Sequence, residues 1–420
     1  MNSRQRVERT LNHQPPDRVP LDLGSSATTG MHASSVYLLR QAFKLDAPGT
    51  PVKVIDPLSM LGEIQPDLAD ALGVDVVGLF APRNKFGFRN ENWKPWTLFD
   101  GTPVLVAEAF NTRPEADGSI LQYPEGDRAA PASGKMPYGG YYFDAIIRQP
   151  PIDEAKLDPL DNLQEFGPIS AADLAYFEGE AARLYRETDR AILASFGGTA
   201  FGDIGLVPVP GIKHPRGIRD VAEWYMSMAT RPDYIYKVFE VQCQIGLANL
   251  EKLYGVVGSQ VTAVFATGTD FGAQNGPFIS PKTYRELYLP FHKQVNAWIH
   301  RHTPWKSLIH SCGSVVQLIP YFIEAGFDIL NPLQTSAVGM DPQALKDRFG
   351  EQLVFWGGGV DTQKTLPFGT PEEIRAQVRE RMRILGRGGG FVFNTIHNVQ
   401  ARIPVENLLA LYQAVAEYRG

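Results

Sequence analysis

Cysteine is scarce in this chain of 420 residues, which contains only Cys243 and Cys312. Two cysteines cannot build the multiple-disulfide framework of small secreted proteins, and this usage is typical of a reducing cytoplasm. Long apolar runs are absent too, since no stretch approaches the roughly 20 residues that a membrane-spanning helix needs. The segment Met1 to Arg9 is charged and lacks the apolar core of a signal peptide. We therefore expect a cytoplasmic protein with no membrane association.

An excess of positive charge is also missing. The chain has 40 Lys and Arg against 46 Asp and Glu, a net charge of −6, so it offers no electrostatic basis for binding nucleic acid. Its hydrophobic content of 44% is enough for a large buried core. Although the length would allow several domains, α/β barrels often run long as one domain. We predict a single domain over residues 1–420 with a small-molecule substrate.

Short apolar runs recur along the chain, and most are followed by a segment that can form a helix. The runs are nearly continuous in apolar character, as parallel strands buried on both faces are. Strands that alternate with helices predict an α/β fold, a (β/α)₈ TIM barrel. The predicted strands span residues 19–23, 74–79, 191–196, 261–266, 307–310, 328–333, 353–356 and 391–393, and the predicted helices 221–229, 233–253, 281–302, 315–325, 341–349, 371–385 and 405–417.

Residues 80–150 break this alternation. They are rich in Gly, Pro, Asn, Asp and aromatic residues, and sequences such as Phe99-Asp-Gly-Thr favour β-hairpins. Because the segment follows the second predicted strand, we expect a β-rich insertion on the C-terminal rim of the barrel, where it can cover the pocket.

Polar residues and glycines follow almost every predicted strand. Barrel enzymes keep their active sites at the carboxyl ends of their strands, so these side chains are expected to converge on one pocket. We predict that four of them bind substrate, namely Gln274, Asn331, Gln334 and Asn394.

His310 and Cys312 are the sharpest feature of the sequence. In an extended strand end, residues two apart point the same way. A histidine and a cysteine placed so can bind one metal ion, and Zn²⁺ suits nitrogen and sulfur ligands best. His397, after the last predicted strand, would be a third ligand and leave one coordination position open for a reactant. The alternative is a buried cysteine and a hydrogen-bonded histidine with no metal, because free cysteine is often simply buried.

Two aspartates are candidates for catalytic roles. Asp270 is a general base, a substrate anchor or a group that orients a ligand histidine; alternatively, it caps the turn-rich loop that follows. Asp361 follows the run Gly357-Gly-Gly-Val and either binds substrate or caps its own loop.

The chain resembles the uroporphyrinogen decarboxylase superfamily over nearly its whole length. The segment from Arg6 to Pro20 looks like the family's first helix and strand, and Phe393–His397 with Ile403–Ala410 is similar to its last strand and helix. The resemblance independently implies a (β/α)₈ barrel.

Two chemistries occur in this superfamily. The decarboxylases bind tetrapyrrole carboxylates through N-terminal arginines, but the matching region here, Leu21–His32, contains none. The other branch comprises zinc- and corrinoid-dependent methyltransferases, such as the methylcobalamin:coenzyme M enzymes, whose ligands are a His-x-Cys pair and a later cysteine. His310 and Cys312 match the pair, and His397 stands at the third position in place of cysteine. Segments 268–281 and 328–334 also look like this branch.

The resemblance therefore implies methyl transfer between a corrinoid and a small thiol or a methylated heteroatom. No corrinoid-binding domain is visible in the chain, so methylcobalamin or a separate corrinoid protein would carry the methyl group. Two other hypotheses are a decarboxylase or lyase, in which Asp270 or Asp361 stabilises a protonated intermediate, and a non-catalytic corrinoid-binding scaffold. Barrels of this family often dimerise, so a homodimer is a further expectation.

Overall fold

A parallel sheet of seven strands forms the centre of the computed structural model, which describes residues 1–418. The sheet curls, and the order of its strands is β15-β14-β13-β12-β11-β10-β3. The strands are β3 (Val76–Leu79), β10 (Ala191–Ala194), β11 (Ala263–Thr267), β12 (Lys306–His310), β13 (Ile329–Asn331), β14 (Val354–Trp356) and β15 (Phe391–Val392). The predicted α/β fold with parallel strands is confirmed.

The first predicted strand, residues 19–23, is reduced to one pairing position. Leu21 forms an isolated parallel bridge with Phe393, and its carbonyl oxygen accepts a hydrogen bond from the backbone of Asp75 over 2.7 Å. Pro20 has no N–H to donate to a ladder, and the chain turns away after Leu23. Leu21 therefore lies between the two edges of the curled sheet without forming a full eighth strand.

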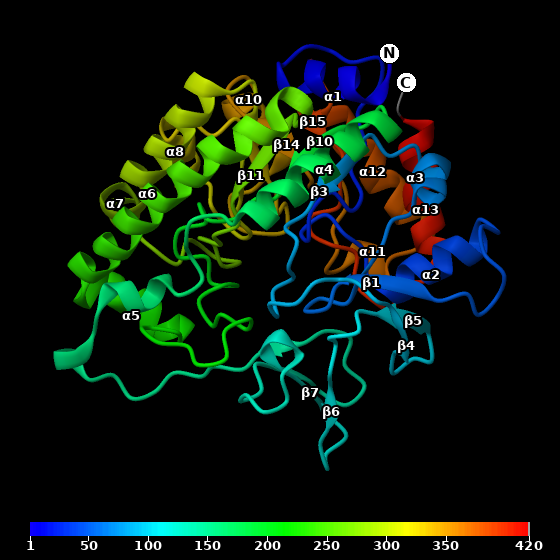
Figure 1. The fold of residues 1–420 in the computed structure, drawn as a ribbon. Coiled ribbons are helices and arrows are strands. Elements are labelled where there is room, and N and C mark those ends of the chain that lie inside the picture. The colour runs from blue at the N-terminus through cyan, green and yellow to red at the C-terminus, as the bar shows by residue number, and fades with distance from the viewer. Residues whose placement is uncertain (419–420) are drawn as a thin grey trace.

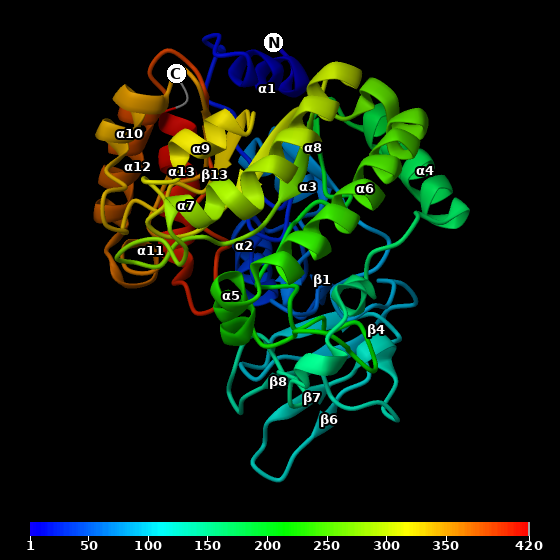
Figure 2. The same cartoon turned by 90° about the vertical axis from the view of Figure 1, so that its left-hand side faces the viewer.

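Helices surround the sheet on its outer side (Figure 1, Figure 2). Proline at the first helical position and a capping side chain start several of them; Thr370 and Glu373, for example, form a capping box at α12. The helices outside the sheet are α2 (Ala33–Ala42), α3 (Pro66–Leu72), α4 (Ala171–Glu187), α5 (Val221–Thr230), α6 (Pro232–Val257), α7 (Pro281–Thr283), α8 (Leu289–His302), α9 (Ile319–Glu324), α10 (Pro342–Phe349), α11 (Thr365–Phe368), α12 (Pro371–Leu385) and α13 (Val405–Glu417). Among residues 1–418, no helix combines the length and apolar character needed to span a bilayer.

A β-rich segment lies at the end of the molecule opposite α1 (Ser3–Leu11) (Figure 1, Figure 2). It contributes to two four-stranded sheets, ordered β2-β1-β5-β4 and β6-β7-β8-β9. Arg148, which follows β9 in this segment, donates to the carbonyl oxygens of Val209 and Ile212 at 2.8 and 2.7 Å, which joins the segment to the long loop after β10. The strands are β1 (Val52–Asp56), β2 (Leu61–Gly62), β4 (Lys94–Thr97), β5 (Pro103–Val106), β6 (Arg113–Pro114), β7 (Ile120–Gln122), β8 (Gly134–Met136) and β9 (Asp144–Ala145).

Side chains alternate between the inside and the outside of the curled sheet. An apolar cluster that includes Leu308, Ile329 and Val392 fills the inside, while neighbours such as Ile309 and Leu330 pack outward in the larger core under the helices. The residues two positions beyond the three inward ones are polar: His310, Asn331 and Asn394.

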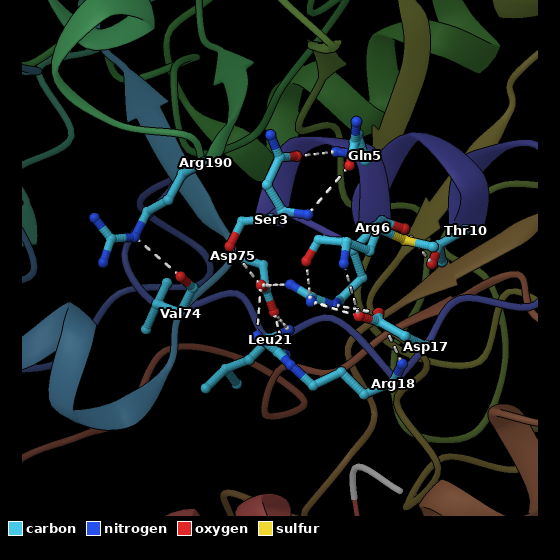
Figure 3. Close-up of polar contacts among 12 residues, drawn as sticks. Ser3, Gln5, Arg6, Thr10, Asp17, Arg18, Leu21, Val74, Asp75 and Arg190 are labelled. Atoms are coloured by element: carbon cyan, nitrogen blue, oxygen red, sulfur yellow. Dashed lines mark hydrogen bonds and ion pairs between the residues drawn. The ribbon is translucent and has the colours of Figure 1, made fainter.

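A buried carboxylate fixes α1 to the amino-terminal end of β3. Asp75 is fully buried and accepts hydrogen bonds from Ser3, Arg6, Arg18 and the backbone of Leu21, at distances between 2.6 and 2.9 Å (Figure 3). The carboxylate therefore neutralises the buried Arg6 guanidinium and the partly exposed one of Arg18.

Candidate metal centre

Three side chains that the sequence singled out meet beyond the carboxyl end of β12. The ligand atoms of His310, Cys312 and His397 all lie within 4.8 Å of one another. The Cys312 Sγ is 3.5 Å from the His310 Nε2, and the two imidazole rings are 5.5 Å apart at their centroids in an edge-to-face arrangement. His310 is buried, and the other two are partly exposed. The centre is therefore largely buried, and Cys312 and His397 are its parts that solvent can reach.

Asn331 determines which nitrogen of His310 faces the other two groups. Its Nδ2 donates to the carbonyl oxygen of Trp356 at 2.7 Å, so its Oδ1 faces the His310 Nδ1 at 2.6 Å. An amide oxygen only accepts, and Nδ1 therefore carries the proton. The lone pair of His310 is consequently on Nε2, the nitrogen that points at Cys312.

Asp270, three residues after β11, holds the loop that carries Cys312. Its Oδ1 accepts the backbone N–H of Cys312 at 2.6 Å and lies 3.7 Å from the His310 Nε2. The Tyr225 hydroxyl of α5 donates to the Asp270 backbone oxygen at 2.9 Å. Two of the roles considered for Asp270 were to position a ligand residue and to cap its own loop. Its contacts with Cys312 and His310 favour the first of these.

Burial changes the protonation of the candidate ligands. It raises the pKa of the Cys312 thiol well above its usual value, and the nearby Asp270 charge adds to this effect. Burial, with a smaller contribution from His310, lowers the pKa of His397 to about 4. At neutral pH His397 is therefore uncharged and can offer a lone pair, while Cys312 keeps its proton until a cation replaces it.

The predicted substrate-binding residues are distributed unevenly around this centre. Gln334 is buried, and its Oε1 accepts the backbone N–H of Gly313 at 2.7 Å, next to Cys312. Gln274 is exposed and donates to Gln363 at 3.1 Å. Asn331 and Gln334 are thus joined to the centre by hydrogen bonds, and the side chain of Gln274 is engaged elsewhere.

Asn394 and Asp361 support the backbone around them. The Asn394 Nδ2 donates to the backbone oxygen of Asp22 at 2.9 Å. The Asp361 Oδ1 accepts the backbone N–H groups of Gln363 and Lys364 at 2.7 and 3.2 Å, which is the loop-capping alternative. Substrate binding by Asn394 and catalysis by Asp361 stay predictions.

Two charged residues near the centre were not identified from the sequence. Asp203 lies in the loop after β10, and Lys85 lies in the β-rich segment. The charge of Lys85 lowers the pKa of both Asp203 and His397, which means that it faces the same region. Asp203 follows a strand of the sheet, and this position could have identified it as a candidate site residue. The place of Lys85 depends on the tertiary fold of the β-rich segment, which the sequence pattern does not reveal.

The chain is similar to known proteins of one family. The family model described as uroporphyrinogen decarboxylase (URO-D) matches residues 212–418. A uroporphyrinogen decarboxylase of Neisseria gonorrhoeae is 23% identical over 329 residues, 77% of this chain and 80% of the relative. That of Neisseria meningitidis serogroup C is 26% identical over 332 residues, with the same shares covered.

A solved structure shares the fold. The methyltransferase from Methanosarcina mazei matches over 100% of both chains with a TM-score of 0.55 and 14% sequence identity. At this identity the likeness extends to the architecture of the chain.

Proposed function

Since this chain belongs to the uroporphyrinogen decarboxylase superfamily, we propose that it is a zinc-dependent methyltransferase that transfers a methyl group between a corrinoid and a small thiol or methylated heteroatom substrate. The observation that carries the proposal is the meeting of His310, Cys312 and His397 within 4.8 Å. The solved methyltransferase with the same fold supports it, as does the absence of arginine from residues 21–32.

The donor set fits Zn²⁺. Two imidazole nitrogens and one sulfur are ligands that zinc takes in proteins, and three protein ligands leave a position for substrate. His310 would bind through Nε2, His397 through a neutral imidazole, and Cys312 as the thiolate left after it loses its proton. Bound there, zinc supplies a Lewis acid that favours the thiolate form of a substrate thiol at neutral pH.

The surrounding residues hold this arrangement. Asn331 keeps the His310 lone pair on Nε2, Asp270 holds the Cys312 backbone, and Gln334 holds that of Gly313. The three candidate ligands would hold a substrate thiolate as the nucleophile, and a methylated corrinoid would supply the methyl group. In the opposite direction, a polarised methylated heteroatom would lose its methyl group to the reduced corrinoid. The corrinoid arrives as a free cofactor or on a separate protein.

Metal removal tests the proposal. Protein stripped with a chelator is expected to lose methyl transfer from methylcobalamin to a thiol such as 2-mercaptoethanol, and restored Zn²⁺ should recover it. The assay follows the loss of methylcobalamin absorbance, with protein taken through the same buffer exchanges without chelator as the control. Full activity in the stripped protein would reject a zinc-dependent transfer.

The role of Asn331 gives a second test. Replacing it with leucine removes the acceptor for the His310 Nδ1–H, so zinc affinity should fall by about 10- to 100-fold. Asn331→Asp keeps an acceptor at this place and should lose less. Competition with a chromophoric chelator measures both affinities, and an unchanged affinity in Asn331→Leu would contradict the orienting role.

Decarboxylation of a carboxylated substrate is a second candidate, because the curated relatives are uroporphyrinogen decarboxylases. In that case Asp270 or Asp361 would stabilise a protonated intermediate. Release of carbon dioxide from candidate acids, unaffected by chelators, would favour this function over methyl transfer. Uroporphyrinogen itself is not the expected substrate, since residues 21–32 contain no arginine.

A further inference from the structure

Asp203 belongs to a loop that is fixed against β11. The Thr199 hydroxyl donates to the Ala266 carbonyl at 2.5 Å, and the Thr269 hydroxyl donates to the Phe201 carbonyl at 2.8 Å. Gly202 adopts a φ of +59°, and a Cβ there would lie 2.9 Å from both the Trp224 Nε1 and the Tyr288 hydroxyl. The backbone that carries Asp203 therefore comes this close only because residue 202 is glycine.

One oxygen of the Asp203 carboxylate remains available. Its Oδ1 accepts the backbone N–H of Gly205 at 2.9 Å. Its Oδ2 lies 3.1 Å from the position that a Cβ on Gly268 would occupy, and within residues 1–418 it has no hydrogen-bond or ion-pair partner. The free oxygen is thus turned toward the end of β11, two residues from Asp270.

Asp270 connects this position to the candidate metal centre. Its own Oδ1 is occupied by the Cys312 N–H and lies 3.7 Å from the His310 Nε2. Asp203 and Asp270 both lie near this strand end. Asp270 holds the backbone of Cys312, whereas the Asp203 Oδ2 has no such task.

The charges that face Asp203 suit a group that gains and loses a proton near neutrality. Burial raises the pKa of Asp203 to about 7, with Asp270 raising it further and Lys85 opposing the shift. The other titratable groups that interact with it are the hydroxyls of Tyr225 and Tyr288, whose pKa values burial raises, so both stay neutral.

We propose that Asp203 takes up the proton that a substrate thiol loses when it binds beside His310, Cys312 and His397. The S–H bond breaks, its electron pair stays on sulfur, and an O–H bond forms at the Asp203 Oδ2. The negative charge of the bound thiolate raises the pKa of Asp203, so the proton stays on Asp203 while the thiolate is bound. It leaves to solvent once the product has dissociated, which restores the carboxylate. This inference rests on the proposed transfer of methyl groups to a thiol and assigns the base for that step.

Calorimetry tests the proton transfer without measuring turnover. Zinc-loaded protein is titrated with 2-mercaptoethanol in two buffers of different ionisation enthalpy, which gives the number of protons released to solvent per thiol bound. At about pH 8 the wild-type protein should release about one proton fewer than Asp203→Asn, because its own carboxylate retains it. At about pH 6, where Asp203 is already protonated, the two proteins should release the same number.

Two further variants separate the carboxylate from the fold. Asp203→Glu should restore the retained proton, and Asp144→Asn, an exposed aspartate on β9, should behave as wild type. The wild type alone also provides a test, since its proton release should rise as the pH falls from about 8 to about 6. Equal release from wild type and Asp203→Asn at about pH 8, with thiol bound by both, would overturn the role of Asp203 alone. Failure of the zinc-loaded wild type to bind the thiol would overturn the proposed thiol chemistry, and the inference with it.

Discussion

Replacing His310 with alanine is expected to slow methyl transfer by at least about a thousandfold, while the protein stays folded. A metal acting as a Lewis acid is worth several kcal/mol in the transition state, and each 1.36 kcal/mol corresponds to about a factor of ten in rate. His310 is 3% exposed and supplies one of the three donor atoms, so no solvent-exposed group replaces it. The measurement is the rate of methylcobalamin consumption with a thiol acceptor.

His300→Ala is the matched control for this loss. His300 lies on α8, is exposed, and forms a 2.8 Å contact with Asp328 away from the candidate centre. This variant should keep the wild-type rate, and circular dichroism should be unchanged in both variants. A His310→Ala protein that retains the full rate would show that the imidazole takes no part in the reaction.

Replacing Asp75 with asparagine is expected to lower the free energy of unfolding by about 3–5 kcal/mol. The change removes the charge that neutralises Arg6 and Arg18 in a site where Asp75 itself is 0% exposed. Arg6 keeps its 2.7 Å ion pair with Asp17 in this variant. Most of the lost stability should therefore come from the ion pair between Arg18 and Asp75. Urea unfolding followed by tryptophan fluorescence measures the change.

Asp70→Asn serves as the comparison for this loss. Asp70 also pairs with an arginine, Arg190, but its side chain is 75% exposed, and exposed pairs are worth about 0–1 kcal/mol. Its unfolding midpoint should stay near that of the wild type. If Asp75→Asn unfolds at the same urea concentration as Asp70→Asn, the buried network does not hold α1 to β3.

Local patterns predicted the regular part of the fold well. The helix predicted over residues 405–417 coincides with α13, because an apolar stripe follows Pro404 without interruption. The helix over residues 171–187 was not predicted, although Ser170 caps it; Gly179 interrupts its pattern, and tertiary packing on α6 compensates. The pairing of β1 with β5 depends on contacts between segments about fifty residues apart, which periodicity does not reveal.

Alternation along the strands explains why the centre could be found from the sequence. His310 and Asn331 each stand two positions after an inward apolar residue, so their inward direction follows from the strand period. Asp203 and Gln274 lie in loops, where no period fixes the direction of a side chain. Asp203 faces the strand end that bears Asp270, and Gln274 faces solvent. This difference depends on the path of each loop. The single-domain organisation and the homodimer stay predictions.

The zinc content of purified protein tests the candidate centre most directly, with elemental analysis of the wild type beside two cysteine variants. Cys243 is buried within α6, so Cys243→Ser changes the other cysteine without touching the proposed ligands. We predict about one zinc per chain in the wild type and in Cys243→Ser, and almost none in Cys312→Ser. Equal zinc in all three proteins, or none in the wild type after growth with added zinc, would contradict metal binding by His310, Cys312 and His397.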